Sequence, residues 1–210
     1  MNTENLIKNL AQTATPVQPI ASPVSRFVRW LLAAVFCVGV GTALLGLRQD
    51  LTMAMKNNFF SVQIFVLIGL TIFSALSAFI LSVPDKNRPW LMRLPMTTMF
   101  LWFAFIIWSF WLHDNMQKST GIGTLCIRDI ALLALIPGLL LFVMLKQAAS
   151  LKPSLVGFFA MLGVLALGAL GTLFICRNDS PLHSLLWHYL PVLCIGGTGI
   201  FLGRVFLRWQ

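Results

Sequence analysis

Residues 60–82 read FSVQIFVLIGLTIFSALSAFILS, a run without any charged side chain. About 20 consecutive apolar residues are enough for an α-helix to cross the hydrocarbon core of a bilayer. A soluble domain can bury one or two such helices, but not a succession of them. Six runs of this kind follow one another, at Phe27–Leu47, Phe60–Ser82, Leu94–Leu112, Leu125–Leu145, Ser154–Ile175 and His183–Phe206. We therefore expect an all-α integral membrane protein, a bundle of six transmembrane helices.

The composition agrees with this prediction and leaves little chain outside the membrane. Hydrophobic residues make up 58% of the 210 residues and charged residues only 10%, against roughly 25% charged residues in soluble domains. We expect a leader at residues 1–26, a membrane domain at residues 27–206 and a short tail at residues 207–210. The polar leader is too long for a secretory signal, so the first run is predicted to stay as an uncleaved span.

The placement of Lys and Arg predicts the orientation, because cytoplasmic loops carry the excess of positive charge. With the N-terminus inside, ten cations fall on the inner side and five on the outer side. The inner ones are Lys8, Arg26, Arg29, Lys86, Arg88, Arg93, Lys146, Lys152, Arg204 and Arg208; the outer ones are Arg48, Lys56, Lys118, Arg128 and Arg177. Most tryptophans fall at span ends, Trp30 at an inner one, as headgroup anchors do. Both termini are predicted to be cytoplasmic, in a bacterial inner membrane.

The net charge of +9 does not indicate a nucleic-acid-binding surface, because the basic residues are scattered between apolar runs. The sequence has no Ser/His/Asp arrangement, no phosphate-binding Gly-rich loop and no HExxH motif, so we predict no enzymatic activity. No span carries an ionisable residue at its centre, which argues against a proton-coupled transporter or an ion pump. Glycines such as Gly199, Gly203 and Gly168 are expected to pack helices closely, and Pro137 and Pro191 to kink them.

The four cysteines divide into two kinds. Cys37 and Cys194 lie within spans, where a thiol behaves as a small apolar side chain. Cys126 and Cys176 lie at outer ends of the fourth and fifth spans, so the two could return to one membrane depth. A periplasm would permit a disulfide between them, and the neighbouring Arg128 and Arg177 could favour the reactive thiolate. The two spans need not touch at that height, so an unpaired role stays open.

All three histidines, His113, His183 and His188, also fall on the predicted outer side. Together with Cys126 and Cys176 they form a set of ligands that could hold zinc, copper or cadmium. Asp114 and Asp179 lie near the same ends. His183 and His188 are five residues apart, which does not place two side chains directly on one face of an α-helix. Hydrogen bonding at the membrane interface is the alternative role for each histidine. We expect no permanent cofactor.

The leader is the one predicted extramembrane segment long enough to hold a partner. Leu6, Ile7 and Leu10 occupy one side of a potential short helix, with Thr3 available as its N-cap. A helix this short is marginal in water. We expect it to fold against a groove on another protein, or to lie on the lipid surface.

Several segments of the chain resemble the NrsF-type negative regulators of sigma factor F, a family of six-span anti-sigma factors of proteobacteria. The likeness covers nearly the whole chain, and the order and spacing of the segments carry it. They are Glu4-Asn5-Leu6-Ile7-Lys8-Asn9-Leu10, Leu81-Ser82-Val83-Pro84, Cys126-Ile127-Arg128, Cys176 with a short polar loop, His183-Ser184-Leu185-Leu186-Trp187-His188, and the ending Gly203-Arg204 to Trp209.

The resemblance implies that the leader holds an extracytoplasmic-function sigma factor at the membrane, away from RNA polymerase. It also implies that Cys126 and Cys176 sense oxidants or thiol-reactive metals and trigger release of the sigma factor, with no direct contact to nucleic acid. Two other functions stay open. One is a small transporter-like bundle whose outer Cys/His set admits a metal ion, and the other is a purely structural membrane subunit.

Overall fold

The computed structural model describes residues 3–13, 20–84, 89–112, 123–148 and 150–207, which contain helices and no strand. The helices are α1 (Thr3–Thr13), α2 (Pro23–Leu45), α3 (Leu51–Ala54), α4 (Asn58–Leu81), α5 (Pro89–Leu112), α6 (Thr124–Lys146), α7 (Pro153–Leu173), α8 (Pro181–His183), the π-helix η2 (Ser184–Tyr189) and α9 (Leu190–Phe206). Six segments among them are long and apolar enough to cross a membrane: α2, α4, α5, α6, α7 and the continuous segment Pro181–Phe206. This confirms the predicted all-α class and six helices with the length and composition of membrane spans, and the cytoplasmic placement of both termini stays a prediction.

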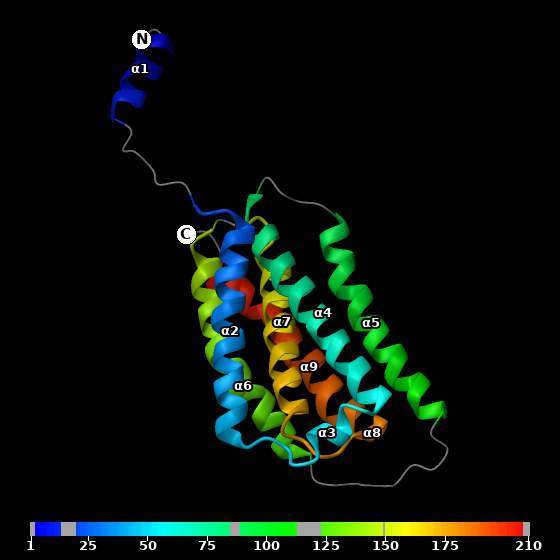
Figure 1. Ribbon diagram of the computed structural model, residues 1–210. Helices are drawn as coiled ribbons and strands as arrows, with labels where there is room; N and C mark the ends of the chain where they lie inside the picture. Colours follow the sequence, from blue (N-terminus) through cyan, green and yellow to red (C-terminus); the bar gives the residue numbers. More distant parts are fainter. Residues whose placement is uncertain (1–2, 14–19, 85–88, 113–122, 149, 208–210) are drawn as a thin grey trace.

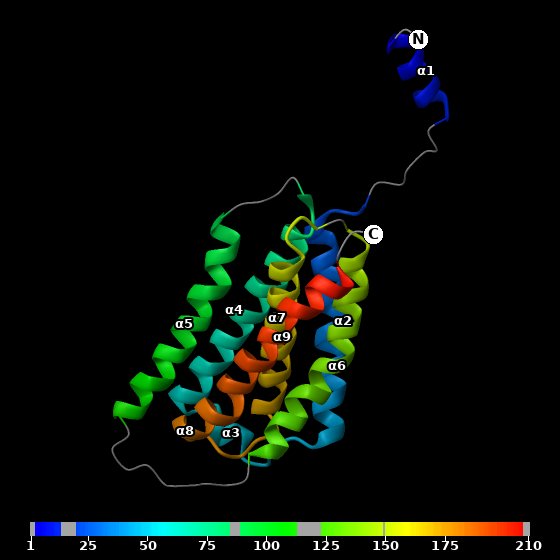
Figure 2. The same cartoon turned by 180° about the vertical axis from the view of Figure 1, so that it is seen from behind.

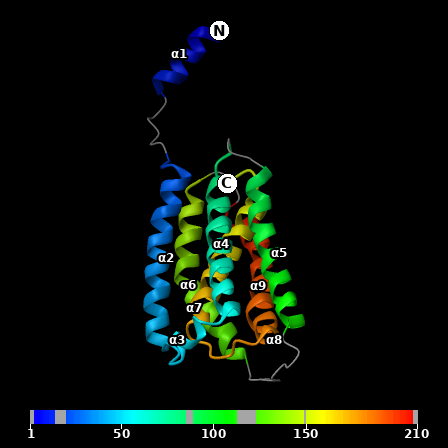
Figure 3. The same cartoon turned by 45° about the vertical axis from the view of Figure 1, so that its right-hand side comes forward.

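The six long segments form one bundle with α7 at its centre (Figures 1 and 2). α7 packs against α2, α4, α6 and α9, while α5 lies at the edge beside α4 (Figure 3). α2 begins and α9 ends at the same end of the bundle, which we call the leader end because α1 lies beyond it (Figure 1). The opposite end carries α3, α8 and the start of α6, and we call it the cysteine end.

Glycines explain how α7 comes so close to its neighbours. A Cβ on Gly157 of α7 would overlap the backbone of Gly199 and Gly203 in α9, and a Cβ on Gly168 would come within 2.6 Å of the Ile130 carbonyl oxygen in α6. Gly171 likewise leaves no room beside Val38 of α2. Because glycine has no side chain, two helices that meet at glycines can bring their backbones close together and gain dispersion energy. The predicted packing role of Gly168, Gly199 and Gly203 is confirmed.

Local sequence sets several helix ends at both ends of the bundle. The Ser22 hydroxyl and the Asn57 side-chain oxygen accept hydrogen bonds from the first-turn N–H groups of α2 and α4, which otherwise lack intrahelical partners. Proline stands at the start of α2, α7 and α8, where its missing N–H costs nothing. Gly46, with a φ of 95°, ends α2 in a conformation that favours glycine.

Trp30 does not act as the headgroup anchor that the sequence predicts. Its ring is only 1% exposed, and its Nε1 donates a hydrogen bond to the Pro137 carbonyl oxygen at 2.9 Å. The indole therefore ties the first span to the kink-prone turn of α6, where burial requires its N–H to find a partner.

The last span is not a single α-helix. Residues Ser184–Tyr189 form a π-helix, in which the Leu190 N–H donates to the Leu185 carbonyl oxygen five residues earlier. Pro191 follows directly, and its ring clashes with the carbonyl four residues before it, which favours a widened turn. This turn carries His188, and His183 ends α8 directly before it.

Candidate functional site

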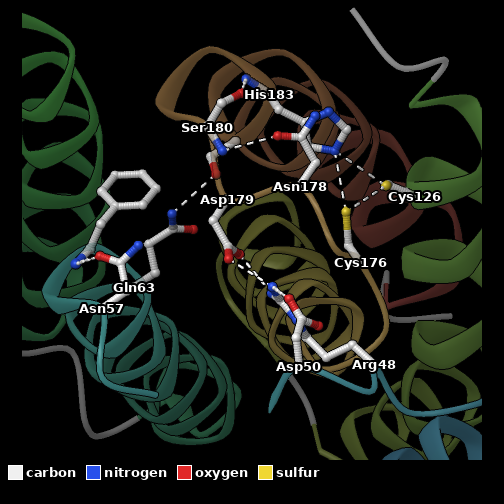
Figure 4. A network of polar contacts seen from close by, with 12 residues as sticks. Arg48, Asp50, Asn57, Gln63, Cys126, Cys176, Asn178, Asp179, Ser180 and His183 are labelled. Carbon is white, nitrogen blue, oxygen red and sulfur yellow. Dashed lines mark hydrogen bonds and ion pairs between the residues drawn. The ribbon is translucent and has the colours of Figure 1, made fainter. Parts of the chain in front are cut away.

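Two cysteines that are 50 residues apart meet at the cysteine end. Cys126 lies in the first turn of α6, and Cys176 follows α7 by three residues. The Cys126 thiol donates a hydrogen bond to the Cys176 sulfur, with the two Sγ atoms 3.4 Å apart (Figure 4). Both are free thiols. The fourth and fifth spans therefore touch at the height of the cysteines, the point that the sequence left open.

The histidine of α8 completes a triangle with the two sulfurs. His183 Nε2 lies 3.4 Å from the Sγ atom of Cys126 and 3.4 Å from that of Cys176 (Figure 4). His188 packs edge-on against His183, with ring centroids 5.6 Å apart. One ligand atom from each of these four residues lies within 4.8 Å of all the others. We call this group the Cys/His cluster.

In an α-helix, the five-residue spacing of His183 and His188 would rotate the second side chain away from the first. The segment between them is instead a π-helix. The π-helix closes its turns with bonds between residues five apart, so the same spacing places both rings on the side of the cysteines. The sequence signal that could have revealed this is Pro191, directly after the turn.

Three members of the cluster are buried and the fourth, Cys176, is half-buried. Cys126 is 8% exposed, His183 5% and His188 0%. His183 Nδ1 and both ring nitrogens of His188 are buried without a hydrogen-bond partner, a costly state for imidazole. The hydrogen bond from Cys126 lowers the pKa of the Cys176 thiol, and His183 and His188 lower it further, against the opposing effect of burial.

Neighbouring helices hold the π-helix against the cysteines. Gly123, which precedes α6, has no room for a Cβ because the Trp187 ring lies against its backbone. The buried Gln63 of α4 donates a hydrogen bond from Nε2 to the Ser184 hydroxyl at 3.1 Å. The Ser180 hydroxyl accepts from the His183 N–H at 3.2 Å and so caps α8. Sequence reasoning missed all three contacts, because each depends on an unpredicted helix pairing or turn.

A buried arginine links the first span to the loop that carries Cys176. The Arg48 guanidinium donates to both oxygens of Asp50, at 2.9 and 2.8 Å, and to both oxygens of Asp179, at 2.7 and 2.8 Å (Figure 4). Its backbone N–H donates to the Phe174 carbonyl oxygen at 2.9 Å. These bonds raise the pKa of Arg48 and hold that of Asp50 at about 2. We call this network the Arg48 clamp; it also uses the Asp179 carboxylate that the sequence placed near the metal ligands.

The other predicted site residues either lie away from the Cys/His cluster or are not among the residues that the structure describes. Arg128 pairs with Asp129 at 2.9 Å, so a carboxylate already offsets the charge that was expected to act on Cys126. Arg177 is exposed and lies close enough to Asp50 to influence that carboxylate instead. Cys37 and Cys194 do not join the cluster. His113 lies outside the described residues.

The leader contains the predicted short helix. α1 starts at Thr3, and the side chains of Ile7 and Leu10 are each 61% exposed. The Leu6 side chain lies outside the described residues. α1 stands clear of the bundle (Figure 1), so two apolar side chains are presented to the surroundings.

The comparisons with known proteins bear on this arrangement. The profile of the family described as "NrsF: Negative regulator of sigma F" matches residues 10–209. The chain belongs to this family. It is also 28% identical to the "Probable anti-sigma-F factor NrsF" of Azospira oryzae (strain ATCC BAA-33 / DSM 13638 / PS), an alignment that covers all of both chains. No solved structure matches the chain. Membership implies negative regulation of a sigma factor and confirms the resemblance seen in the sequence. The family is one of regulators and is not a known enzyme family.

Proposed function

We propose that this protein is a bacterial inner-membrane anti-sigma factor that holds an extracytoplasmic-function sigma factor through its leader. It releases the sigma factor when Cys126 and Cys176 react with an oxidant or a thiol-reactive metal. In this proposal the leader end faces the cytoplasm and the cysteine end the periplasm. The observation that carries it is the 3.4 Å approach of the two thiols at the end of the bundle opposite α1.

The thiol pair is suited to a two-electron oxidant. Each thiol gives up one proton and one electron, the oxidant accepts both electrons, and an Sγ–Sγ bond of about 2.05 Å forms. The sulfurs start 3.4 Å apart, so bond formation draws the start of α6 and the loop after α7 together by about 1.4 Å. A periplasmic position supplies the oxidising compartment that such a reaction needs.

The Arg48 clamp offers a mechanical connection by which a structural change at the cysteines could reach the leader. Asp179 lies three residues after Cys176, and Arg48 lies three residues after the end of α2. α2 then runs the length of the bundle to Pro23, close behind the leader. Because a helix of this length is a stiff rod of about 35 Å, a shift of the Cys176 loop is passed to the leader end through α2.

Co-purification tests the proposed function directly. The full chain is extracted from its native host in mild detergent and captured by a C-terminal tag, with and without prior treatment of the cells with diamide. We expect a sigma factor of the extracytoplasmic-function class in the untreated sample and a strong decrease after diamide. Absence of any sigma factor from the untreated sample would refute the proposal.

Removing the positive charge of Arg48 should leave oxidation of the two thiols intact but weaken release of the sigma factor. In an Arg48→Met variant we expect the free energy of unfolding to fall by about 1–3 kcal/mol, less than for a fully buried pair because Asp50 and Asp179 can be rehydrated. Diamide should still cross-link Cys126 to Cys176, but release of the sigma factor should weaken. The matched control is Lys56→Met, an exposed cation at the same end. Cross-linking with undiminished release in Arg48→Met would exclude the clamp as the route.

A metal transporter is the second candidate, since the Cys/His cluster could admit an ion. Among the described residues, the cluster is the one group of three or more His, Cys, Asp or Glu side chains close enough to hold a metal. Cys37 and Cys194 lie on other helices and do not extend it toward the leader end. This arrangement favours a sensor. Uptake of zinc or cadmium into proteoliposomes would instead support the transporter.

A further inference from the structure

We infer that Cys126, Cys176, His183 and His188 together form a closed tetrahedral binding site for Zn²⁺ or the related ion Cd²⁺. The inference deepens the proposed function by naming the ion and its four ligands, and it rests on that function for its role in signalling. Binding itself requires only the residues of the cluster.

The spacing of the ligand atoms fits a tetrahedral ion. Zinc binds sulfur at about 2.3 Å and imidazole nitrogen at about 2.0–2.1 Å, so its ligand sulfurs lie about 3.8 Å apart and each sulfur about 3.6 Å from a nitrogen. In the cluster, the sulfur–sulfur distance and both sulfur–His183 Nε2 distances are 3.4 Å. Three ligand atoms therefore need to move apart by only a few tenths of an ångström.

His188 supplies the second, independent observation. Its ring is fully buried, and neither of its nitrogens has a hydrogen-bond partner. A buried polar group without a partner is destabilising. Since a ring nitrogen of His188 lies within 4.8 Å of the other three ligand atoms, coordination of an ion would give that nitrogen its missing partner.

Charge and ligand type also favour this ion class. Two thiolates and two neutral imidazoles around a divalent ion make a site with no net charge, which suits a place shielded from water. A mixed set of thiolate and imidazole ligands is typical of zinc, and four protein ligands leave no open position for a reacting water. The cluster therefore fits a site for binding an ion and not a catalytic centre.

A metal titration tests the inference on the whole chain without a sigma factor. The protein is purified in detergent, fully reduced, with the Cys37→Ser and Cys194→Ser changes that leave the cluster as its one pair of thiols. Zn²⁺ is titrated against a chromogenic chelator, and Co²⁺ serves as a spectroscopic probe. We expect one ion per chain, an absorption spectrum of tetrahedral Co²⁺ with thiolate charge transfer, and the same affinity when Cys37 and Cys194 are present.

Single changes identify the ligands. His183→Ala and His188→Ala should each weaken Zn²⁺ binding at least about 100-fold, since even loss of an outer hydrogen-bond partner costs 10–100-fold. Diamide cross-linking of Cys126 to Cys176 in each variant shows that the cysteine end is still folded. Zinc affinity unchanged by both histidine variants, an octahedral Co²⁺ spectrum, or no binding by the unaltered cluster would each overturn the inference. Those results would leave diamide-triggered release, measured by co-purification, unaffected.

Discussion

A Cys126→Ser, Cys176→Ser variant is expected to keep its sigma factor in the presence of oxidant, so that induced transcription falls to the uninduced level. Serine is close to cysteine in size, which preserves the packing between α6 and the loop after α7. Its hydroxyl can form neither a disulfide nor a strong bond to a soft metal ion. Transcription from a promoter that depends on the bound sigma factor, measured with and without diamide or Cd²⁺, reports the effect.

The control for this prediction lies in the same chain. A Cys37→Ser, Cys194→Ser variant removes the same number of thiols, but these thiols lie away from the Cys/His cluster. Its induction should equal that of the unaltered protein. Normal induction in the Cys126→Ser, Cys176→Ser variant would rule out the thiol pair as the sensor, even if the chain still binds a sigma factor.

Replacing Leu6, Ile7 and Leu10 together with alanine is expected to weaken capture of the sigma factor by about 100-fold. Interface anchors contribute about 1 kcal/mol or more each, and a total of about 3 kcal/mol corresponds to that factor. Alanine is the best helix former, so the change removes the apolar side of α1 without unfolding it. Binding of the purified sigma factor to the full chain in detergent measures the effect.

The opposite side of α1 provides the matched comparison. Asn5 and Lys8 are exposed and lie on the polar side of the helix, and an Asn5→Ala, Lys8→Ala variant should bind the sigma factor nearly as the unaltered chain does. Equal affinity in the triple-alanine variant would show that the sigma factor binds elsewhere. In cells that carry the triple-alanine variant, the expected weak capture should appear as transcription without any inducer.

The two ends of the last span differ in how well the sequence predicts them. The apolar run that ends at Phe206 predicts a membrane-crossing helix, because length and hydrophobicity alone satisfy the bilayer. The π-turn at Ser184–Tyr189 could not be predicted in the same way. A single widened turn depends on how its side chains pack against Gly123, Gln63 and the cysteines, and not on mean hydropathy.

Four features could be predicted from the sequence alone: the all-α class, the six apolar helices long enough to cross a membrane, the close glycine contacts, and a cysteine at one end of each of two spans. Those features follow from properties of single segments, chiefly apolar length and small side chains. Three contacts are visible only in the folded structure: Cys126 lies against Cys176, His183 and His188 lie beside both cysteines, and Arg48 forms an ion pair with Asp179. Each of these contacts joins segments distant in the chain or depends on one irregular turn, and helix pairing in a membrane is set by close packing that periodicity does not record.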